Sequence, residues 1–452
     1  MTRKLHTTGV IAVALLTLTG VVTACGKSEK STSSTGAAST LTVGSGKQYR
    51  TITAAVKAAK PGALILVSPG VYKEAVDVTT DRLTIRGLDR NTVILDGQFK
   101  ASNGIRVLGA NGVTVQNMTA RNYKGNGFFW TGVDGYKGQY LTAYNNGDYG
   151  IYAFKSVNGL WEDSYASGSP DAGFYIGGCQ PCNALIRNVV SEYNGLGYSG
   201  TNSGGNLILA NSTFRHNRAG IVPNSGSYEV CYPERGDIIV GNQVYDNNYD
   251  TGPAIDNAQL AQNNGILVAG GWRNQIIRNR VTNHRLTGIA LVPFPETNAS
   301  DVEPETPAAT CADQEKLPKA TDVPDTVLWS SKENTVKDNV VSGSDLADLA
   351  TADGDGSAKN CFAGNTFATT APHDLETLAP CGSSGTGDFT AGALDLGALI
   401  ARETNPSGDY KTQPKPPNQP NMAGAATAAA SPAGPPPKFD VDAVTVPPEP
   451  PK

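Results

Sequence analysis

Aromatic and basic side chains recur at one position of a short phrase that this sequence repeats. The phrase is a glycine, an apolar residue, a variable residue and a second apolar residue, and the variable position holds Arg106, Phe129, Tyr152 and Tyr175. Aromatic rings in a row offer flat apolar faces, and an exposed row often marks a binding surface. Because flat rings suit the apolar faces of sugars, we expect Phe129, Tyr152, Tyr175 and the neighbouring Phe154 to bind carbohydrate.

The same region offers groups for proton transfer on an acidic sugar. Acid–base chemistry on a uronic acid needs a proton acceptor, a proton donor and a group that neutralises the carboxylate. Tyr152, Lys155 and Arg106 are our candidates for these catalytic roles. The competing interpretation is that neighbouring loops cover the column of side chains, which then has a structural role only.

The spacing of the phrases predicts the fold that positions these residues. The glycines of the first five phrases are 23, 23, 23 and 24 residues apart, and a period near 23 is typical of a solenoid. A second phrase, an apolar residue followed by Asn, accompanies them, and Asn tolerates the left-handed conformation of a corner. Two strand phrases and an Asn corner per period predict an all-β right-handed parallel β-helix over residues 41–382. The glycines that open the phrases are Gly104, Gly127, Gly150, Gly173, Gly197, Gly220, Gly265 and Gly288.

Alternation along a strand decides which side chains face outward. The residue after each glycine is expected to point into the core and the next one outward. Coils stack about 4.8 Å apart, so Arg106, Phe129, Tyr152 and Tyr175 should form one outer column. Insertions interrupt the coils, and those that follow a first strand meet at the same corner. The expected insertions are residues 223–236, 249–262 and 293–326.

Both ends of the solenoid need a cover for their apolar residues. Residues 51–59 are helical in period, with Thr51 or Thr53 as the N-cap, and predict a capping helix. At the other end, residues 383–403 predict a closing helix. Residues 404–452 are rich in Pro and Ala, and this composition predicts a disordered tail.

The first residues indicate export. Arg3 and Lys4 precede an apolar run at residues 10–22, which is too short to span a bilayer and is typical of a signal peptide over residues 1–24.

The run ends in Val-Thr-Ala-Cys, which resembles the cleavage box of bacterial lipoproteins. The resemblance implies lipidation of Cys25 and a lipid anchor at the outer face of the bacterial cell membrane, with residues 25–40 as a flexible stalk. A plain signal peptide with a chance Cys is the alternative.

Six cysteines are left once the lipid-bearing one is set aside. In an exported chain an even number suggests three disulfides, for which fifteen pairings are possible in principle. A redox or metal motif is the alternative for the Cys-Gln-Pro-Cys segment. Pairing sequence neighbours gives Cys179–Cys182 and Cys361–Cys381, and leaves Cys231–Cys311.

Charge and candidate metal ligands restrict the partners. The net charge is −5 and no basic run suggests nucleic acid, so we expect a glycan partner, membrane contact through the lipid alone, and a monomer. We expect no required cofactor and no metal bound by His or Cys, and we interpret His216 and His284 as corner residues. Four acidic residues in neighbouring coils either cap turns or bind Ca²⁺. They are Asp134, Asp148, Asp163 and Asp171.

Two segments resemble known families. Residues 49–52 and 72–74 resemble the opening of pectin-lyase-like β-helix proteins, including pectin methylesterases and bacterial surface repeat proteins, and this resemblance covers roughly residues 41–370. Residues 149–155 are similar to coils of mannuronan C5-epimerases. Those enzymes carry Asp-Pro-His where this chain has Tyr152-Ala153-Phe154, so the resemblance implies the fold and leaves that activity in doubt.

These patterns predict a cell-surface lipoprotein that binds a polysaccharide or cell-wall glycan along the first-strand face. Its stronger form includes lyase- or epimerase-type processing. The alternatives are a non-catalytic scaffold or adhesin, and an accessory protein of a metalloenzyme system. The sequence holds no residue set specific enough to name the polymer.

Overall fold

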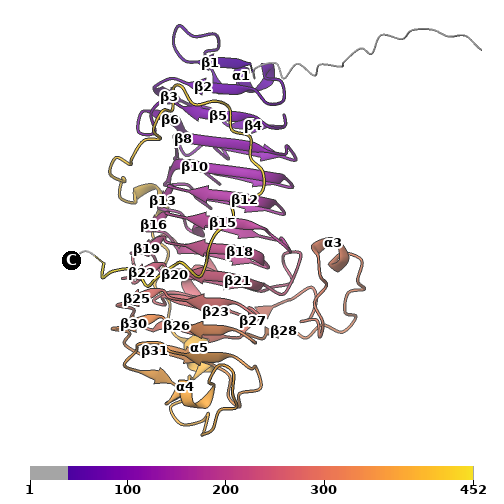
Figure 1. Cartoon of the computed structure of the whole chain (residues 1–452), viewed down its shortest axis with the longest axis vertical. Helices are drawn as coiled ribbons and strands as arrows, with labels where there is room; N and C mark the ends of the chain where they lie inside the picture. Colours follow the sequence, from indigo (N-terminus) through magenta and orange to yellow (C-terminus); the bar gives the residue numbers. More distant parts are fainter. Residues whose placement is uncertain (1–38, 451–452) are drawn as a thin grey trace, which may run out of the picture. The chain divides into compact units, whose positions relative to one another are not determined.

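Parallel strands stacked coil upon coil make up the structure, a computed structural model that describes residues 39–450 (Figure 1). The expected signal peptide, Cys25 and all but the last two residues of the expected stalk lie outside the described residues. Within residues 39–450, no helix has the length and hydrophobicity needed to cross a membrane.

The first-strand face is an 11-stranded parallel sheet that holds the glycine phrases. Its strands, in chain order, are β4 (Val76–Val78), β7 (Ile105–Leu108), β9 (Phe128–Thr131), β11 (Ile151–Phe154), β14 (Ala172–Gly177), β17 (Leu196–Thr201), β20 (Ala219–Asn224), β23 (Ile266–Ala269), β26 (Thr287–Val292), β31 (Ala347–Thr351) and β33 (Thr370–Ala371).

A 20-stranded sheet forms the other two faces, because β8 and β10 run through the corner and pair on both sides of it. One face holds β1 (Thr40–Val43), β2 (Leu64–Val67), β5 (Thr84–Gly87), β8 (Val113–Arg121), β10 (Asp134–Tyr144), β12 (Val157–Glu162), β15 (Ala184–Arg187), β18 (Gly204–Ala210), β21 (Arg235–Val240), β24 (Gln275–Ile277), β29 (Thr335–Lys337) and β32 (Cys361–Ala363). The other adds β3 (Gly70–Tyr72), β6 (Val93–Asp96), β13 (Tyr165–Ser167), β16 (Val190–Glu192), β19 (Thr213–Arg215), β22 (Gln243–Tyr245), β25 (Arg280–Thr282) and β30 (Val340–Ser342). The expected right-handed parallel β-helix is confirmed.

The core follows the expected alternation. The residue after each phrase glycine points inward and is at most 1 % exposed, and each such burial contributes about 2 kcal/mol. These residues are Ile105, Phe128, Ile151, Phe174, Tyr198, Ile221, Ile266 and Ile289.

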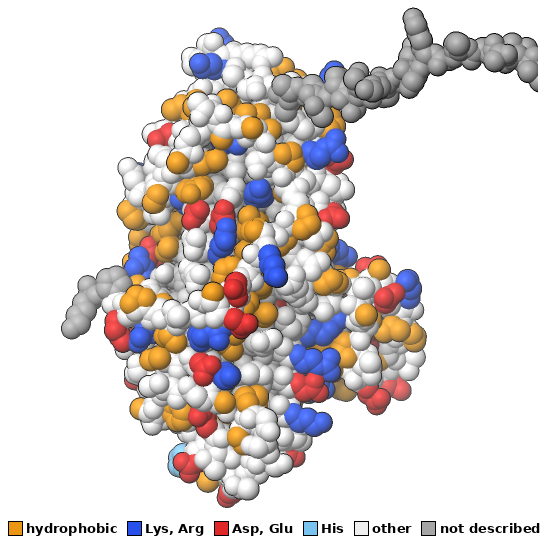
Figure 2. All heavy atoms as spheres, in the orientation of Figure 1, with side chains coloured by type: hydrophobic (Ala, Val, Ile, Leu, Met, Phe, Trp, Pro, Cys, Tyr) orange, Lys and Arg blue, Asp and Glu red, His pale blue; other side chains and the backbone are white. Residues whose placement is uncertain are grey.

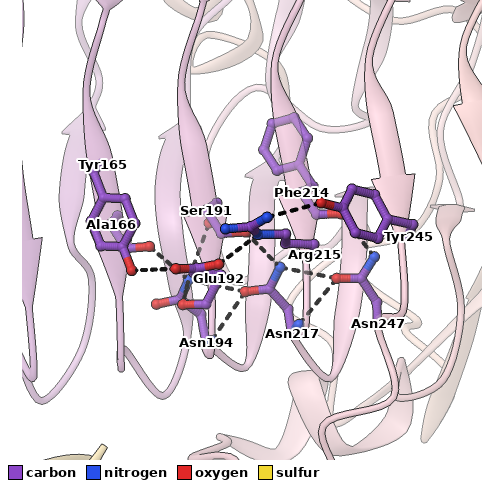
Figure 3. Close-up of polar contacts among 10 residues, drawn as sticks. All are labelled: Tyr165, Ala166, Ser191, Glu192, Asn194, Phe214, Arg215, Asn217, Tyr245 and Asn247. Atoms are coloured by element: carbon purple, nitrogen blue, oxygen red, sulfur yellow. Dashed lines mark hydrogen bonds and ion pairs between the residues drawn. The ribbon is translucent and has the colours of Figure 1, made fainter. Parts of the chain in front are cut away.

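Stacked amides close the corners (Figure 3). The amide oxygen of Asn217 accepts hydrogen bonds from the backbone and side-chain nitrogens of Asn194, both at 3.0 Å, and Asn217 donates in the same way to Asn247. A second stack runs from Asn242 through Asn279 and Asn339 to Asn365. At the corner of this second stack, the Asn residues of earlier coils take a positive φ instead of stacking. These are Asn117, Asn188 and Asn211.

Helices cover both ends of the core. Thr51 caps α1 (Ile52–Ala58), because its side chain accepts from the Ala54 N–H at 3.2 Å. At the other end, α4 (Leu375–Leu378) inserts a fully buried Leu375, and Glu376 accepts from both nitrogens of Asn365 at 2.8 Å. The expected closing helix forms as α5 (Leu396–Ala401), but it packs on the first-strand face and leaves the end to α4.

Three insertions build structure outside the coils. Between β20 and β21, residues 225–234 form a loop, and the chain between β22 and β23 contains α2 (Asp256–Leu260). After β26, the antiparallel strands β27 (Phe294–Thr297) and β28 (Thr326–Trp329) form a hairpin whose long connection contains α3 (Cys311–Gln314), and Figure 1 shows it projecting from the solenoid.

The cysteines pair as expected. The disulfides are Cys179–Cys182, Cys231–Cys311 and Cys361–Cys381.

The chain after residue 403 differs from the expected disordered tail. Residues 404–450, here called the C-terminal strap, follow a defined path along the solenoid and include a short 3₁₀ helix, η1 (Tyr410–Thr412) (Figure 1, yellow). Composition alone does not predict this path, because arginines of the solenoid bind the strap. Arg218 donates to Asn405 O at 2.7 Å, and Arg86 donates to Ala428 O at 2.6 Å. The strap also buries Val444 against the coils.

The amide stack predicts a large effect of one substitution. Asn279→Ala removes four hydrogen bonds. It leaves buried donors or acceptors of Asn242, Ile239 and Asn339 without these partners. We expect the free energy of unfolding to fall by about 3 kcal/mol, measured by urea denaturation. The exposed control Gln48→Ala should change it by less than about 0.5 kcal/mol. Equal effects of the two substitutions would contradict the role of the stack.

The strap gives a second prediction. Removal of residues 404–452 deprives the buried Arg86, Arg90 and Arg218 of carbonyl acceptors. Since hydrogen bonds to charged groups contribute about 1.5–3 kcal/mol each, the free energy of unfolding should fall by about 5 kcal/mol. Urea denaturation checks this, with Arg273→Ala, which breaks an exposed ion pair, as the control. An unchanged midpoint would mean that the strap is not bound in solution.

Candidate functional site

The expected outer column is present on the first-strand face. Strand register aligns Arg106, Phe129, Tyr152 and Tyr175 on successive coils. The ring centroids of Phe129 and Tyr152 are 4.8 Å apart, and those of Tyr152 and Tyr175 are also 4.8 Å apart with an interplanar angle of 18°. Phe154 stacks beside Tyr152 with its centroid 6.3 Å away. The four rings therefore form one continuous aromatic surface.

Only part of that surface is open. Phe129, Tyr152 and Phe154 are half-buried, whereas Tyr175 is 1 % exposed. The Tyr175 hydroxyl donates to the carboxylate of Glu229, with distances of 2.7 and 2.6 Å to its two oxygens. Residues 225–234 thus cover one end of the column, and only the other end is available for stacking.

A second set of acidic and phenolic groups joins the column at its covered end. Asp148 and Tyr149 directly precede the β11 coil, and Asp171 directly precedes β14. The Tyr149 ring packs against Tyr152 and Tyr175, with centroid distances of 4.5 and 4.7 Å, and burial together with the nearby Asp171 carboxyl raises the pKa of Tyr149. We call this set the carboxylate–tyrosine cluster. It comprises Asp148, Tyr149, Tyr152, Asp171, Tyr175 and Glu229.

Burial changes the acidity of the cluster. Removal from water raises the pKa of Asp148 to about 6, that of Glu229 to about 7 and that of Asp171 to about 8. The same cause raises the pKa of the tyrosines well above its usual value. Near neutral pH the cluster therefore contains protonated and ionised carboxyl groups side by side, which is the condition for general acid–base chemistry.

The loop that carries Glu229 is held from outside the coils. The Cys231–Cys311 disulfide lies two residues beyond Glu229 and joins the loop to the connection of the β27–β28 hairpin. The side chain of Glu296 on β27 accepts from the backbone N–H of Ser227 at 2.7 Å and from its hydroxyl at 2.8 Å. The insertion after β26 therefore fixes the position of an acidic group of the cluster.

The predicted catalytic residues are only partly brought together. Tyr152 lies in the cluster. The exposed Lys155 has its ammonium over the Phe154 ring, 5.6 Å from the centroid, and its charge acts to lower the pKa of Glu229. Arg106 instead forms a two-point ion pair with Asp77, at 2.9 and 3.0 Å, and lies two coils from Tyr152. The structure therefore does not bring Arg106 into the cluster.

Sequence reasoning missed Tyr149 and Glu229 as site residues. For Asp148 and Asp171 the sequence predicts only turn caps or calcium ligands. Both acids lie two residues before a phrase glycine. Because this position recurs in successive coils, it could have indicated that the two carboxyl groups lie near each other. No pattern points to Glu229, because its loop reaches back over the column only in the folded chain.

Below the cluster the first-strand face borders a cavity of about 280 Å³. Asp171, Tyr149 and Glu229 line one end of this cavity, and aliphatic side chains of later coils line most of the rest. The cluster is therefore a junction between an open aromatic surface and an apolar recess.

The remaining metal-ligand candidates do not converge. Among residues 39–450, no group of three or more His, Cys, Asp or Glu side chains could hold a metal ion. His284 is buried beside the Asn247 amide, 3.2 Å away, and burial lowers its pKa to about 3. His216 stacks on Tyr193 at the same type of corner.

On the face drawn in Figure 2, acidic and basic side chains are interspersed.

A family model agrees with the architecture. The family described as "right handed beta helix region" matches residues 103–294, and curated protein sequences give no match. The A-module of mannuronan C-5 epimerase AlgE6 from Azotobacter vinelandii aligns with a TM-score of 0.44 at 13 % identity, over 70 % of this chain and 89 % of that chain. The AlgE4 A-module of the same organism aligns with a TM-score of 0.42 at 13 % identity, over 74 % and 94 %. An alginate lyase from Paenibacillus sp. str. FPU-7 aligns with a TM-score of 0.31 at 12 % identity, over 73 % and 98 %.

The raised pKa of Asp171 predicts how stability depends on pH. The folded chain holds a proton on Asp171 up to a pKa of about 8, whereas an unfolded Asp loses it near 3.8. Between these values the native state binds more protons, so this group lowers the stability as pH rises from about 4 to 8. Relative to the parent, Asp171→Asn should gain stability progressively across this window and level off above it.

Urea denaturation at several pH values checks the difference. The exposed Asp256→Asn is the matched control and should show no such trend. A difference between parent and Asp171→Asn that stays constant from pH 4 to pH 8 would be inconsistent with a buried, protonated Asp171.

Proposed function

We propose that this chain is an exported, lipid-anchored protein that binds a polysaccharide along the open part of the aromatic column and acts on it by proton transfer at the carboxylate–tyrosine cluster. One observation carries the proposal. The open rings of Phe129, Tyr152 and Phe154 lead directly to carboxyl groups whose pKa values lie near neutrality.

The binding half of the proposal rests on the rings. Three half-buried aromatic faces of adjacent coils offer a strip on which successive sugar rings can pack. Large exposed apolar side chains on neighbouring positions are costly unless a partner covers them. The strip is continuous with the cluster, so a sugar on Tyr152 lies beside Tyr149.

The catalytic half rests on the mixture of protonation states. A lyase or epimerase acting on a uronic acid removes the proton from the carbon next to the carboxylate. An ionised carboxylate of the cluster can accept that proton, and a protonated carboxyl or a tyrosine hydroxyl can donate one to the leaving oxygen or the opposite face. Lys155 is the cation at hand to neutralise the sugar carboxylate.

The cellular location is supported by two features of the chain. The Val-Thr-Ala-Cys box ends at Cys25, and three disulfides pair every other cysteine. Disulfides form and persist in oxidising compartments outside the cytoplasm.

A glycan-binding protein without catalysis is the second candidate. Tyr175 is covered by the loop that carries Glu229, and this burial favours a structural role for that end of the column.

A panel of uronate and neutral glycans tests the proposal. Calorimetry measures binding, and absorbance at short ultraviolet wavelength detects the unsaturated products of a lyase. We expect Tyr152→Ala to weaken binding about tenfold, or about 1.4 kcal/mol, through loss of the central ring. The matched control is Tyr193→Ala, a half-buried ring on another corner, which should bind as the parent does.

Turnover separates the two candidates. Glu229→Gln keeps the shape of the side chain but removes its charge, so it should lower any turnover at least about a hundredfold with little effect on binding. Binding without products would favour the non-catalytic candidate. No binding to any glycan of the panel, or unchanged binding by Tyr152→Ala, would contradict the proposal.

A further inference from the structure

In the coils after the cluster, the outer column of the first-strand face no longer holds aromatic side chains. After Tyr175 the outward positions on successive coils hold Ser199, Val222, Leu267 and Ala290. Aromatic rings give way to small and aliphatic side chains, which leave space where the rings would stand. The cavity of about 280 Å³ occupies this space.

Two short helices roof the space. Leu260 at the end of α2 and Leu396 and Leu399 of α5 line the cavity from outside the sheet. Arg402, directly after α5, donates to Leu260 O at 2.8 Å and to Gln262 O at 3.0 Å, which ties the two helix ends together. The two helices that line the cavity are thus tied to each other within the fold, and its walls are mostly apolar.

The polar groups of the cavity are unevenly placed. Asp171, Tyr149 and Glu229 stand at the end that meets the aromatic column, whereas Leu267, Ala290 and Leu399 line the far part. Asn264 and Thr287 of the same coils also line the cavity, but they are already paired, since the Thr287 hydroxyl donates to the Asn264 amide oxygen at 2.6 Å. A sugar placed in the far part would leave most of its hydroxyls without partners, at a cost of about 1–3 kcal/mol each. An aliphatic chain has no such requirement.

We propose that this cavity binds the aliphatic part of an amphiphilic glycoconjugate, whose sugar lies over Phe129 and Tyr152. The ligand class is a glycan that carries an alkyl or acyl chain, with the sugar–chain junction at the carboxylate–tyrosine cluster. A neutral junction fits best, because Asp171 and Glu229 line the cavity at this point, whereas the cation Lys155 lies over the Phe154 ring at the open end, where the sugar binds. The position of the sugar in this inference rests on the proposed function. The position of the aliphatic chain rests on the apolar walls of the cavity alone.

Alkyl β-glucosides of increasing chain length, kept below their micelle concentrations, test the inference by calorimetry on the mature full chain. Each added methylene should tighten binding about three- to fourfold until the cavity is filled. Glucose itself should bind far more weakly than the octyl glucoside. Binding that does not depend on chain length would overturn the inference.

Two substitutions locate the chain in the cavity. Ala290→Phe fills it from the sheet side, and Leu399→Asp places a charge in it from the half-buried roof, so either should remove the dependence on chain length. Ala398→Asp, exposed on the same helix, is the matched control and should bind as the parent does. Circular dichroism verifies that each variant is folded. Unchanged chain-length dependence in both cavity variants would overturn the inference.

The outcomes separate this inference from the proposed function. Chain-length dependence with no polysaccharide binding and no effect of Tyr152→Ala keeps the cavity assignment and removes the proposed function. If Tyr152→Ala weakens polysaccharide binding but glucoside binding does not depend on chain length, the proposed function stands and the inference of an aliphatic ligand is overturned.

Discussion

The residue-by-residue stacking of parallel strands is the constraint on which the rest of this structure depends. Each coil repeats the register of the coil before it, so Ile151 lies over Phe128 inside while Tyr152 lies over Phe129 outside. A slip by one residue would exchange the two faces and send apolar side chains into water. The amide stacks at the corners hold the same register through buried hydrogen bonds. The aromatic column, the cluster and the cavity all follow from this single alignment.

The cluster shows how a repetitive scaffold accommodates costly groups. Three carboxyl groups kept from water oppose folding, because burial disfavours their ionised form. The surrounding structure offsets this cost with the hydrogen bond from Tyr175, the packing of Tyr149 and the disulfide that holds the loop of Glu229. Carboxyl groups with perturbed pKa values gathered in this way are typical of functional sites.

The irregular parts of the chain decide what the regular part can do. The coils by themselves would leave a flat outer wall, and the segments that leave them turn that wall into a site. The loop at residues 225–234 covers Tyr175, the hairpin anchors that loop, and α2 with α5 encloses the aliphatic coils. The C-terminal strap acts on other faces, where it supplies backbone acceptors to buried arginines such as Arg86 and Arg218.

The sequence by itself determined the coils. A period of about 23 residues with alternating apolar positions was sufficient for the β-helix, the inward residues and the outer column, because such local patterns recur in every coil. Cysteine spacing likewise gave the three disulfide pairs. Tyr152 could be named as a candidate for the same reason, since it occupies a position that the repeat defines, whereas Asp171 was expected only as a turn cap or a calcium ligand.

Only the tertiary structure decided how open that column is and which acids meet on it. Glu229 reaches Tyr175 across 54 residues of sequence, and nothing local to either residue encodes their contact. The strap is the same kind of case, since Ala428 meets Arg86 across 342 residues. Repeats make local pattern and spatial neighbourhood coincide, whereas insertions and tails fold back by long-range contacts whose partners depend on the completed solenoid.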